Sequence, residues 1–250
     1  MIEVRQLRKS FGDVRVLNGV DFSIEKGQAV TIIGVSGGGK SILLKLLIGL
    51  ITPDAGEIFI DGQNITRMDE RELLKVRRKF GMLFQSAALF DSLTVEDNVN
   101  FLLRREGRTT PAEMARRVGE VLELVGLEGT QKKMPAELSG GMRKRVGLAR
   151  AVVYRPEIVL YDEPTTGLDP IAADSIDQLI SRVVDKFKVT SIAVTHDMRS
   201  AGRISRRILM LHEGRIYADQ SPEDIFKSND PVIHRFVNGI ADPIGKTSLV

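Results

Sequence analysis

The sequence predicts an α/β fold with a mixed sheet flanked by helices, an antiparallel β subdomain and an inserted α-helical subdomain. A glycine-rich loop at residues 34–41 lies between an apolar run of strand type and an apolar run of helical type. Strand patterns stop between residues 86 and 154, where apolar residues follow helical spacing instead. Further apolar runs typical of buried strands recur along the chain, at residues 80–84, 158–161 and 190–195.

These changes of pattern set the expected domain organisation. Residues 1–225 form one domain, in which 1–85 and 155–225 make the α/β core and 86–154 make the helical subdomain. Residues 226–250 form a tail that we expect to dock on a partner.

The composition is that of an ordinary globular protein. The 250 residues are 42% hydrophobic and 28% charged, which suffices for a sizeable core. A net charge of +3 does not argue for a nucleic-acid surface, and a sequence without Cys excludes disulfides and thiolate metal sites. The amino terminus lacks the apolar core of a signal peptide, and no run approaches the roughly 18 apolar residues of a membrane span. We therefore expect a cytoplasmic protein whose membrane role goes through a partner.

The glycine-rich loop fits the phosphate-binding pattern G-x-x-x-x-G-K-[ST] in full. Glycine lets backbone amides approach a phosphate chain, because it has no Cβ and tolerates positive φ. The helix predicted from Lys40 to about Leu50 directs its free amides and its positive dipole end at the same anion. Lys40 adds a charge for the β- and γ-phosphates, and the Ser41 hydroxyl is a ligand for Mg²⁺. The predicted phosphate-binding residues are Gly34, Ser36, Gly37, Gly38, Gly39, Lys40 and Ser41.

Residues 1–28 alternate apolar and polar side chains, which indicates antiparallel strands. Phe11 lies in the loop between two of these strands. Spacing leaves two interpretations of Phe11 open: a platform that stacks on a nucleobase, or an ordinary core residue.

The helical stretch begins after Gln85, which follows the strand predicted at 80–84. A polar side chain at the tip of an apolar strand is typical of a site in an α/β protein. Thr94 and Thr110 are predicted to start helices, the second with Pro111 at its first position. The basic pairs of this stretch are interpreted as solvated faces, so we expect no nucleic-acid partner.

The helical stretch ends on Ser139-Gly140-Gly141, followed by a helix expected from Arg143 to about Tyr154. A Ser before two glycines at a helix start offers a second anion-binding terminus, through a side-chain oxygen, a close backbone approach and the helix dipole.

Polar residues also follow two later strands. Asp162 and Glu163 end an apolar strand, where Asp162 is placed to hold Mg²⁺ through water. Glu163 is placed to orient or deprotonate an attacking water. His196 follows the strand at 190–195, and an imidazole there can hydrogen-bond a γ-phosphate and that water.

In this order, the motifs make the chain resemble the ATP-binding subunits of ABC transporters over about residues 1–225. The Leu138-Ser139-Gly140-Gly141 signature before the acid pair is specific to that family, whereas a phosphate loop alone indicates only some NTPase. The resemblance implies a RecA-like ATPase core, ATP hydrolysis with Mg²⁺, and a dimer that holds ATP between the phosphate loop of one copy and the signature of the other.

The same resemblance implies roles for single residues. Phe11 matches the aromatic residue that stacks on the base, and Asp169 matches the loop that crosses the dimer. Gln85 matches the residue that touches Mg²⁺, takes part in catalysis and reports to a polytopic membrane permease. Glu163 and His196 match the residues that act on water and phosphate.

Three segments are most similar to the Mla/Mce-type lipid-transport ATPases, at residues 82–90, 138–145 and 236–242. This closer resemblance implies a phospholipid cargo moved between inner and outer membranes, and a location at the cytoplasmic face of the inner membrane. It also implies Mce-type substrate-binding subunits and small cytoplasmic accessory subunits as partners. Two positions depart from the wider family: Val35 replaces a frequent Pro, and Met142 replaces a frequent Gln beside the signature.

Three alternatives remain. The same ATPase can serve another cargo, such as an amino acid, a metal or a drug. A soluble ABC-type ATPase of DNA repair or translation carries long coiled coils or a second cassette, and the sequence has no heptad run and no second phosphate loop. A GTPase or kinase built on the same loop gives no reason for residues 138–141.

Overall fold

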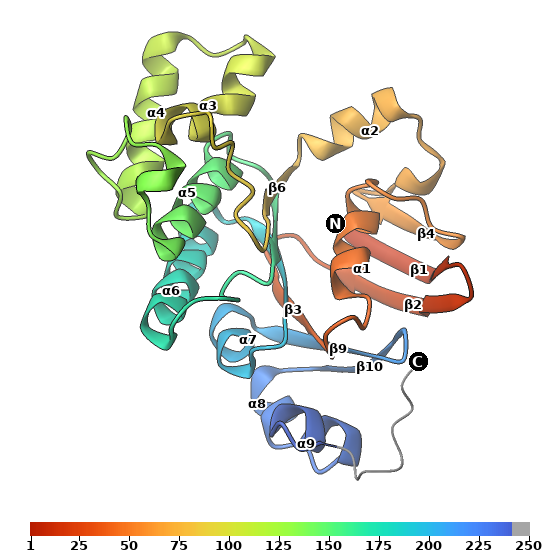
Figure 1. The fold of residues 1–250 in the computed structure, drawn as a ribbon. Coiled ribbons are helices and arrows are strands. Elements are labelled where there is room, and N and C mark those ends of the chain that lie inside the picture. The colour runs from red at the N-terminus through yellow and green to blue at the C-terminus, as the bar shows by residue number, and fades with distance from the viewer. Residues whose placement is uncertain (242–250) are drawn as a thin grey trace. The chain divides into compact units, whose positions relative to one another are not determined.

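The structure, a computed structural model, describes residues 1–241. The chain divides into two compact units, one formed by Met1–Arg77 with the chain from Ala193 onward, the other by Arg78–Ile192 (Figure 1). Within the described residues, no helix combines the length and the apolarity that a membrane crossing requires.

An antiparallel sheet in the first unit confirms the strands expected at residues 1–28. Its order is β2-β1-β4-β5, with Val4 of β1 opposite Phe22 of β2 on one side and Ile58 of β4 on the other (Figure 1). These three side chains are buried, because alternate residues of each strand point to the same face. The strands are β1 (Ile2–Phe11), β2 (Val14–Ile24), β4 (Ala55–Ile60) and β5 (Gln63–Asn64).

A second group of strands in the first unit supports the phosphate loop. β3 (Ala29–Ile33) is parallel to β9 (Arg207–His212), which forms the predicted hairpin with β10 (Arg215–Gln220). On the side of β3 away from β9, the next strand in the order is β8 (Thr190–Thr195), of which only the end belongs to this unit. All five residues of β3 are buried, as expected for a continuous apolar strand between neighbours.

Two short helices of the first unit were not predicted. α7 (Met198–Ile204) and α9 (Pro231–Val237) have seven residues each, too few for apolar spacing to mark them. Asp197 and Asp230 act as their N-caps, and each carboxylate accepts two backbone N–H groups. The remaining helical segments of this unit are α1 (Lys40–Leu47), the 3₁₀ turn η1 (Ile65–Arg67), α2 (Glu70–Arg77) and α8 (Pro222–Phe226).

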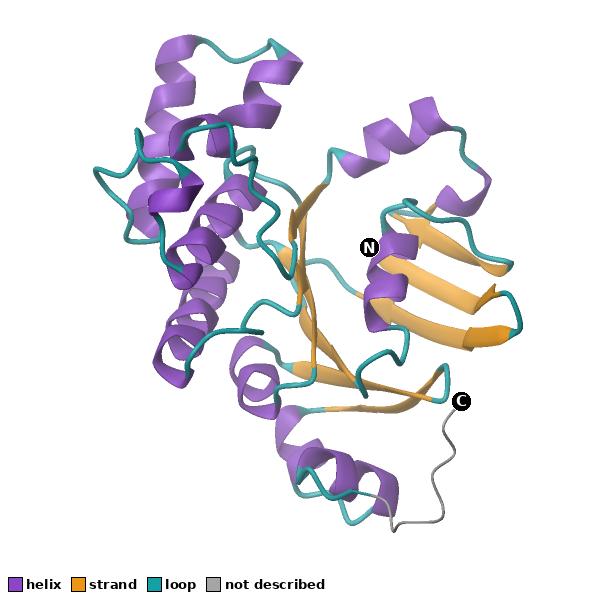
Figure 2. Cartoon of the chain, viewed as in Figure 1, coloured by secondary structure: helices purple, strands orange, loops and turns teal. Residues whose placement is uncertain are grey.

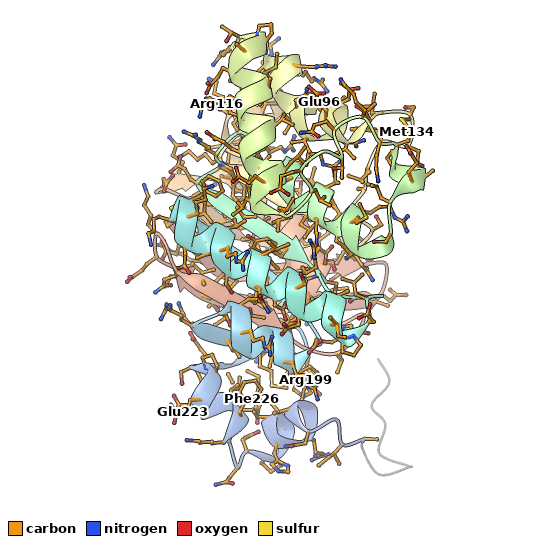
Figure 3. The ribbon with its side chains drawn as sticks, turned by 90° about the vertical axis from the view of Figure 1, so that its left-hand side faces the viewer. Glu96, Arg116, Met134, Arg199, Glu223 and Phe226 are labelled. Atoms are coloured by element: carbon orange, nitrogen blue, oxygen red, sulfur yellow. The ribbon has the colours of Figure 1, made fainter. Side chains whose placement is uncertain are left out.

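The carboxyl-terminal helices pack on their own chain. Ile233 of α9 is 3% exposed and belongs to a buried cluster with Ile33 of β3 and Met210 of β9. The ring of Phe226 on α8, labelled in Figure 3, packs so close to Gly202 of α7 that a Cβ there would come within 2.8 Å of it. The part of the predicted partner-docking tail at residues 242–250 lies outside the described residues.

The second unit is mainly helical (Figure 2). Its parallel strands β6 (Phe80–Leu83) and β7 (Ile158–Asp162) are followed in the strand order by the start of β8. Thr94 and Thr110 cap α3 and α4 as predicted, each accepting a backbone N–H with its hydroxyl oxygen. The helical segments are α3 (Val95–Glu106), α4 (Pro111–Leu124), the 3₁₀ turn η2 (Pro135–Glu137), α5 (Gly140–Val152) and α6 (Pro170–Phe187).

The helix expected to start at Arg143 starts earlier. α5 begins at Gly140, because Ser139 is its N-cap and its Oγ accepts the Met142 N–H at 3.2 Å. Two consecutive glycines have low helix propensity, but a cap and tertiary packing outweigh propensity.

Helix α5 lies against β6 at a position without a side chain. A Cβ at Gly81 would come within 2.1 Å of the Ala151 carbonyl oxygen.

Gly81→Ala therefore forces strand and helix apart, and we expect it to lower the free energy of unfolding by about 3 kcal/mol. Gly119→Ala in α4 is the matched control, since nothing lies within 4 Å of its new methyl group. The control should gain about 0.5–1 kcal/mol from helix propensity. Denaturant unfolding of both variants measures the difference, and equal stabilities would contradict the packing described here.

Candidate active site

The phosphate loop connects β3 to α1 in the first unit. Gly39 is the N-cap of α1 with φ 95°, a left-handed conformation that favours glycine. A Cβ at Gly39 would lie 2.8 Å from Cγ1 of Val16, and one at Gly34 would lie 2.5 Å from the Leu211 carbonyl oxygen. Packing within the chain therefore requires these two glycines, independently of any ligand.

Lys40 is the first residue of α1 and is 5% exposed. Its Nζ donates to the carbonyl oxygens of Gly34 at 2.9 Å and Val35 at 3.0 Å, so the ammonium group lies within the loop. Ser36 and Gly37 are exposed, and Ser41 is half-buried. The loop thus combines exposed residues with a buried positive charge, an arrangement that suits a phosphate chain.

Phe11 ends β1 and is 48% exposed. The core interpretation of Phe11 is therefore wrong, and the stacking role remains as its prediction. Lys9 Nζ lies 5.4 Å from the ring centroid of Phe11, on the same strand.

His196 lies between β8 and α7 and is exposed. The next residue, Asp197, donates its N–H to Thr195 Oγ1 at 3.0 Å and caps α7. This turn fixes the backbone on both sides of the imidazole.

The second unit brings Gln85 to the same sheet edge as the acid pair. β6 and β7 are parallel, with Leu83 opposite Tyr161. Gln85 and Glu163 each follow two residues later, so both lie at the carboxyl edge of this strand pair, where α/β proteins hold ligands. Gln85 is exposed, whereas Asp162 and Glu163 are each 8% exposed.

The backbone of Glu163 is left-handed, with φ 47°. Its carboxylate Oε2 accepts the Thr166 hydroxyl at 3.1 Å, and its carbonyl oxygen accepts the Thr166 N–H at 3.3 Å. The same carbonyl oxygen accepts Lys144 Nζ at 3.2 Å. Sequence reasoning missed Thr166 and Lys144, because a Thr in a turn and a Lys in a helix are usually solvated.

The turn that carries Gln85 is fastened to α5, which the sequence did not indicate either. The N–H of Ala87 donates to the Phe84 carbonyl oxygen at 2.9 Å and closes the turn around Gln85. Arg150 on α5 donates to the carbonyl oxygens of Ala87 at 2.6 Å and Ala88 at 2.7 Å. Both alanines have positive φ, 61° and 48°, a conformation that residues with a Cβ seldom adopt. The Arg150 fork therefore holds an unfavourable turn in place.

The signature lies at the start of α5, where Ser139 and Gly140 are exposed and Gly141 is half-buried. A Cβ at Gly140 would lie 3.9 Å from Leu168 Cδ2, and one at Gly141 would lie 3.8 Å from Ala172 Cβ. Within residues 1–241, therefore, no contact requires glycine at either position.

Asp169 follows Leu168 and caps α6, accepting the N–H groups of Ile171 and Ala172, both at 3.0 Å. Ile171 beside it is 84% exposed. This exposed apolar residue directly precedes Ala172, whose Cβ lies near Gly141 of the signature.

The donor chemistry fits Mg²⁺. The predicted ligands Ser41, Gln85 and Asp162 offer hydroxyl, amide and carboxylate oxygens, which this hard cation prefers. Asp162 is a nearly buried carboxylate, and its negative charge interacts with the ammonium group of Lys144.

Comparison with known proteins agrees with the motif order. Residues 17–166 match the ABC transporter family. The chain is similar to the intermembrane phospholipid transport system ATP-binding protein MlaF of Haemophilus influenzae, 40% identical over 97% of this chain and 92% of that protein. It is also similar to protein TRIGALACTOSYLDIACYLGLYCEROL 3, chloroplastic, of Arabidopsis thaliana, 41% identical over 97% of this chain and 74% of that protein.

The name of a third relative gives a different cargo. The methionine import ATP-binding protein MetN of Carboxydothermus hydrogenoformans is 41% identical over 91% of this chain and 67% of that protein. Among solved structures, a dimeric ATP-binding cassette in a post-hydrolysis state with ADP and Pi superposes with a TM-score of 0.81. That structure is 33% identical and covers 89% of this chain and 99% of its own.

The phosphate loop, the signature and the acid pair thus occur in a chain that matches one family over 17–166. The chain belongs to the ABC transporter family, and it is an ATP-binding subunit that hydrolyses ATP for such a transporter.

Proposed function

We propose that this ATPase drives the movement of phospholipid between an inner and an outer membrane, from the cytoplasmic face of the inner membrane. The similarity to MlaF over nearly the whole of both chains supports this cargo. Its partners are a second copy of itself, a polytopic permease, Mce-type substrate-binding subunits and small cytoplasmic accessory subunits. The similarity to a methionine import ATP-binding protein favours a second candidate function, in which the same ATPase drives transport of an amino acid.

One observation carries the proposal that two copies share each ATP. Gly140 and Gly141 lie at a helix start with room for a Cβ, so no contact among the described residues of their own chain explains why they are glycines. A phosphate group of ATP held by another copy supplies that reason, because it needs close approach to the amides at the start of α5. The dimeric cassette that superposes on this chain supports the same arrangement.

Each copy contributes two sets of groups. Lys40 and the amides of residues 34–41 bind the phosphates, and Phe11 stacks on the base. Ser139, Gly140 and Gly141 of the other copy close over the same nucleotide, with Asp169 nearby. Ser41, Gln85 and Asp162 would hold Mg²⁺, which would neutralise phosphate charge when bound.

Hydrolysis then requires one proton acceptor and one orienting group. Glu163 takes a proton from water as the water oxygen bonds to the γ-phosphorus and the bond to the ADP oxygen breaks. His196 orients the water and stabilises the charge that develops on the γ-phosphate. Loss of the γ-phosphate removes the charge shared by the two copies, and the dimer opens. Because Arg150 fastens the Gln85 turn to α5, this opening moves the turn that reports to the permease together with the signature.

The proton-accepting role is tested with Glu163→Gln, which keeps the side-chain volume and removes the base. We expect turnover to fall by a factor of about 100 or more, while ATP affinity changes little and the ATP-bound dimer becomes long-lived. ATPase assays and size-exclusion chromatography with ATP measure both effects. Unchanged turnover would refute the role of Glu163.

The shared site is tested with Gly140→Asp. A Cβ at this exposed position meets only an ordinary contact, and a carboxylate at a helix start is favourable, so the melting temperature should not fall. ATPase activity should disappear, because the new charge repels the partner's γ-phosphate.

Mixing this variant with Lys40→Ala provides the decisive control. Half of the dimers then pair one intact phosphate loop with one intact signature, so activity should recover to at most about a quarter of the wild-type rate. A mixture as inactive as its two components would contradict the head-to-tail dimer.

The cargo is tested by isolating the complex from a detergent extract of its membrane and identifying its subunits and bound small molecules by mass spectrometry. Co-purified phospholipid and an Mce-type subunit are the expected result. A complex that carries an amino acid and no Mce-type subunit would favour the second candidate.

A further inference from the structure

Lys144 is a buried cation that none of the proposed steps uses. It lies on α5 and is 5% exposed, although lysine is almost never fully buried without a partner. Its Nζ donates to the carbonyl oxygen of Glu163 at 3.2 Å. The residue is therefore directed at the end of β7, where the acid pair lies.

Lys144 also interacts electrostatically with the acid pair, Asp162 and Glu163. Burial lowers the pKa of its ammonium group, and the negative charges of Asp162 and Glu163 oppose that change. An isolated ammonium group would be costly at this depth, so the two carboxylates are what makes the position tolerable.

Lys144 donates its hydrogen bond to a residue that has an unfavourable backbone conformation. Glu163 is left-handed, with φ 47°, a conformation that is uncommon for any residue with a Cβ. Its peptide must therefore be held from outside, and the bonds to its carbonyl oxygen come from Thr166 within the same turn and from Lys144 on another element. Of these two, only Lys144 ties the turn to a helix.

We propose that Lys144 is a positioning residue for Glu163, which holds its peptide at the end of β7 and thereby couples the orientation of the base to helix α5. This inference rests on the proposed role of Glu163 as proton acceptor.

The coupling has a consequence for the dimer. Lys144 lies five residues after Ser139, or about 7.5 Å along the helix axis. The start of α5 faces the ATP of the second copy in the proposed dimer, whereas Glu163 serves the chain's own ATP. A shift of α5 on contact with the partner's nucleotide then also moves the base. In this way one nucleotide site affects the other through a single rigid helix.

The first test separates catalysis from binding in the purified transporter complex. Lys144→Met removes the charge and the donors but keeps an unbranched chain, and we expect kcat to fall about 10-fold with KM for ATP within about twofold. Lys144→Arg keeps a charged donor and should restore most of the turnover. Lys133→Met, an exposed lysine of the same unit, is the matched control and should behave as wild type.

The second test asks whether Lys144 acts through Glu163. In a Glu163→Gln background, the added Lys144→Met change should alter the residual turnover by less than about twofold, because the base that Lys144 positions is already absent. A further 10-fold loss in that background would overturn the inference and leave the role of Glu163 intact. Full turnover by Glu163→Gln alone would instead refute the proposed function, so the two failures are distinguishable.

A folding defect is resolved by a third variant. If Lys144→Met does not yield a folded complex, Lys144→Gln takes its place in both tests, because the uncharged amide suits a buried position but ends one bond short of the lysine Nζ that donates to Glu163. A folded Lys144→Gln with wild-type kcat would overturn the inference, and a lower kcat that vanishes in the Glu163→Gln background would support it.

Discussion

The second unit depends on one packing arrangement, the pairing of β6 with β7 beneath helix α5. The parallel register, with Leu83 opposite Tyr161, makes both strands end at the same edge. The helix approaches this pair closely because Gly81 presents no side chain to it, and Gly147 does the same from the helix, where a Cβ would lie 2.8 Å from Leu83 Cδ1. With larger residues at these points, the helix would stand away from the strand ends.

Because α5 lies so close, its side chains reach the site residues directly. Lys144 contacts the backbone of Glu163, and Arg150 contacts the turn after Gln85. Both contacts hold left-handed residues that carry a Cβ, at Glu163 and at Ala87 and Ala88. Unfavourable backbone conformations persist only where surrounding groups determine them, and such positions concentrate at functional sites. A single helix thus begins at the signature and holds both the Glu163 backbone and the Gln85 turn.

Glycine is present in the phosphate loop and in the signature for different physical reasons. Gly34 and Gly39 of the phosphate loop are required by contacts within the first unit, as well as by any phosphate. Gly140 and Gly141 have space around them in their own chain. A glycine that its own fold does not require indicates close approach by something else, and a helix start favours an anion. This contrast links an observation on one chain to the expectation that the site is completed by another.

The sequence by itself determined the family, the order of strands and helices in the core and most of the candidate site. These features rest on local rules: a loop of fixed spacing, apolar runs of strand length, and caps at Thr94 and Thr110. The same rules missed α7 and α9, since seven residues are too few to show a period.

Only the tertiary structure decided that Phe11 is exposed, that α5 begins at the signature glycines, and that Lys144 and Arg150 contact the site. The reason is that exposure and side-chain contacts depend on which elements meet in space. A buried lysine and a solvated one look the same in the sequence.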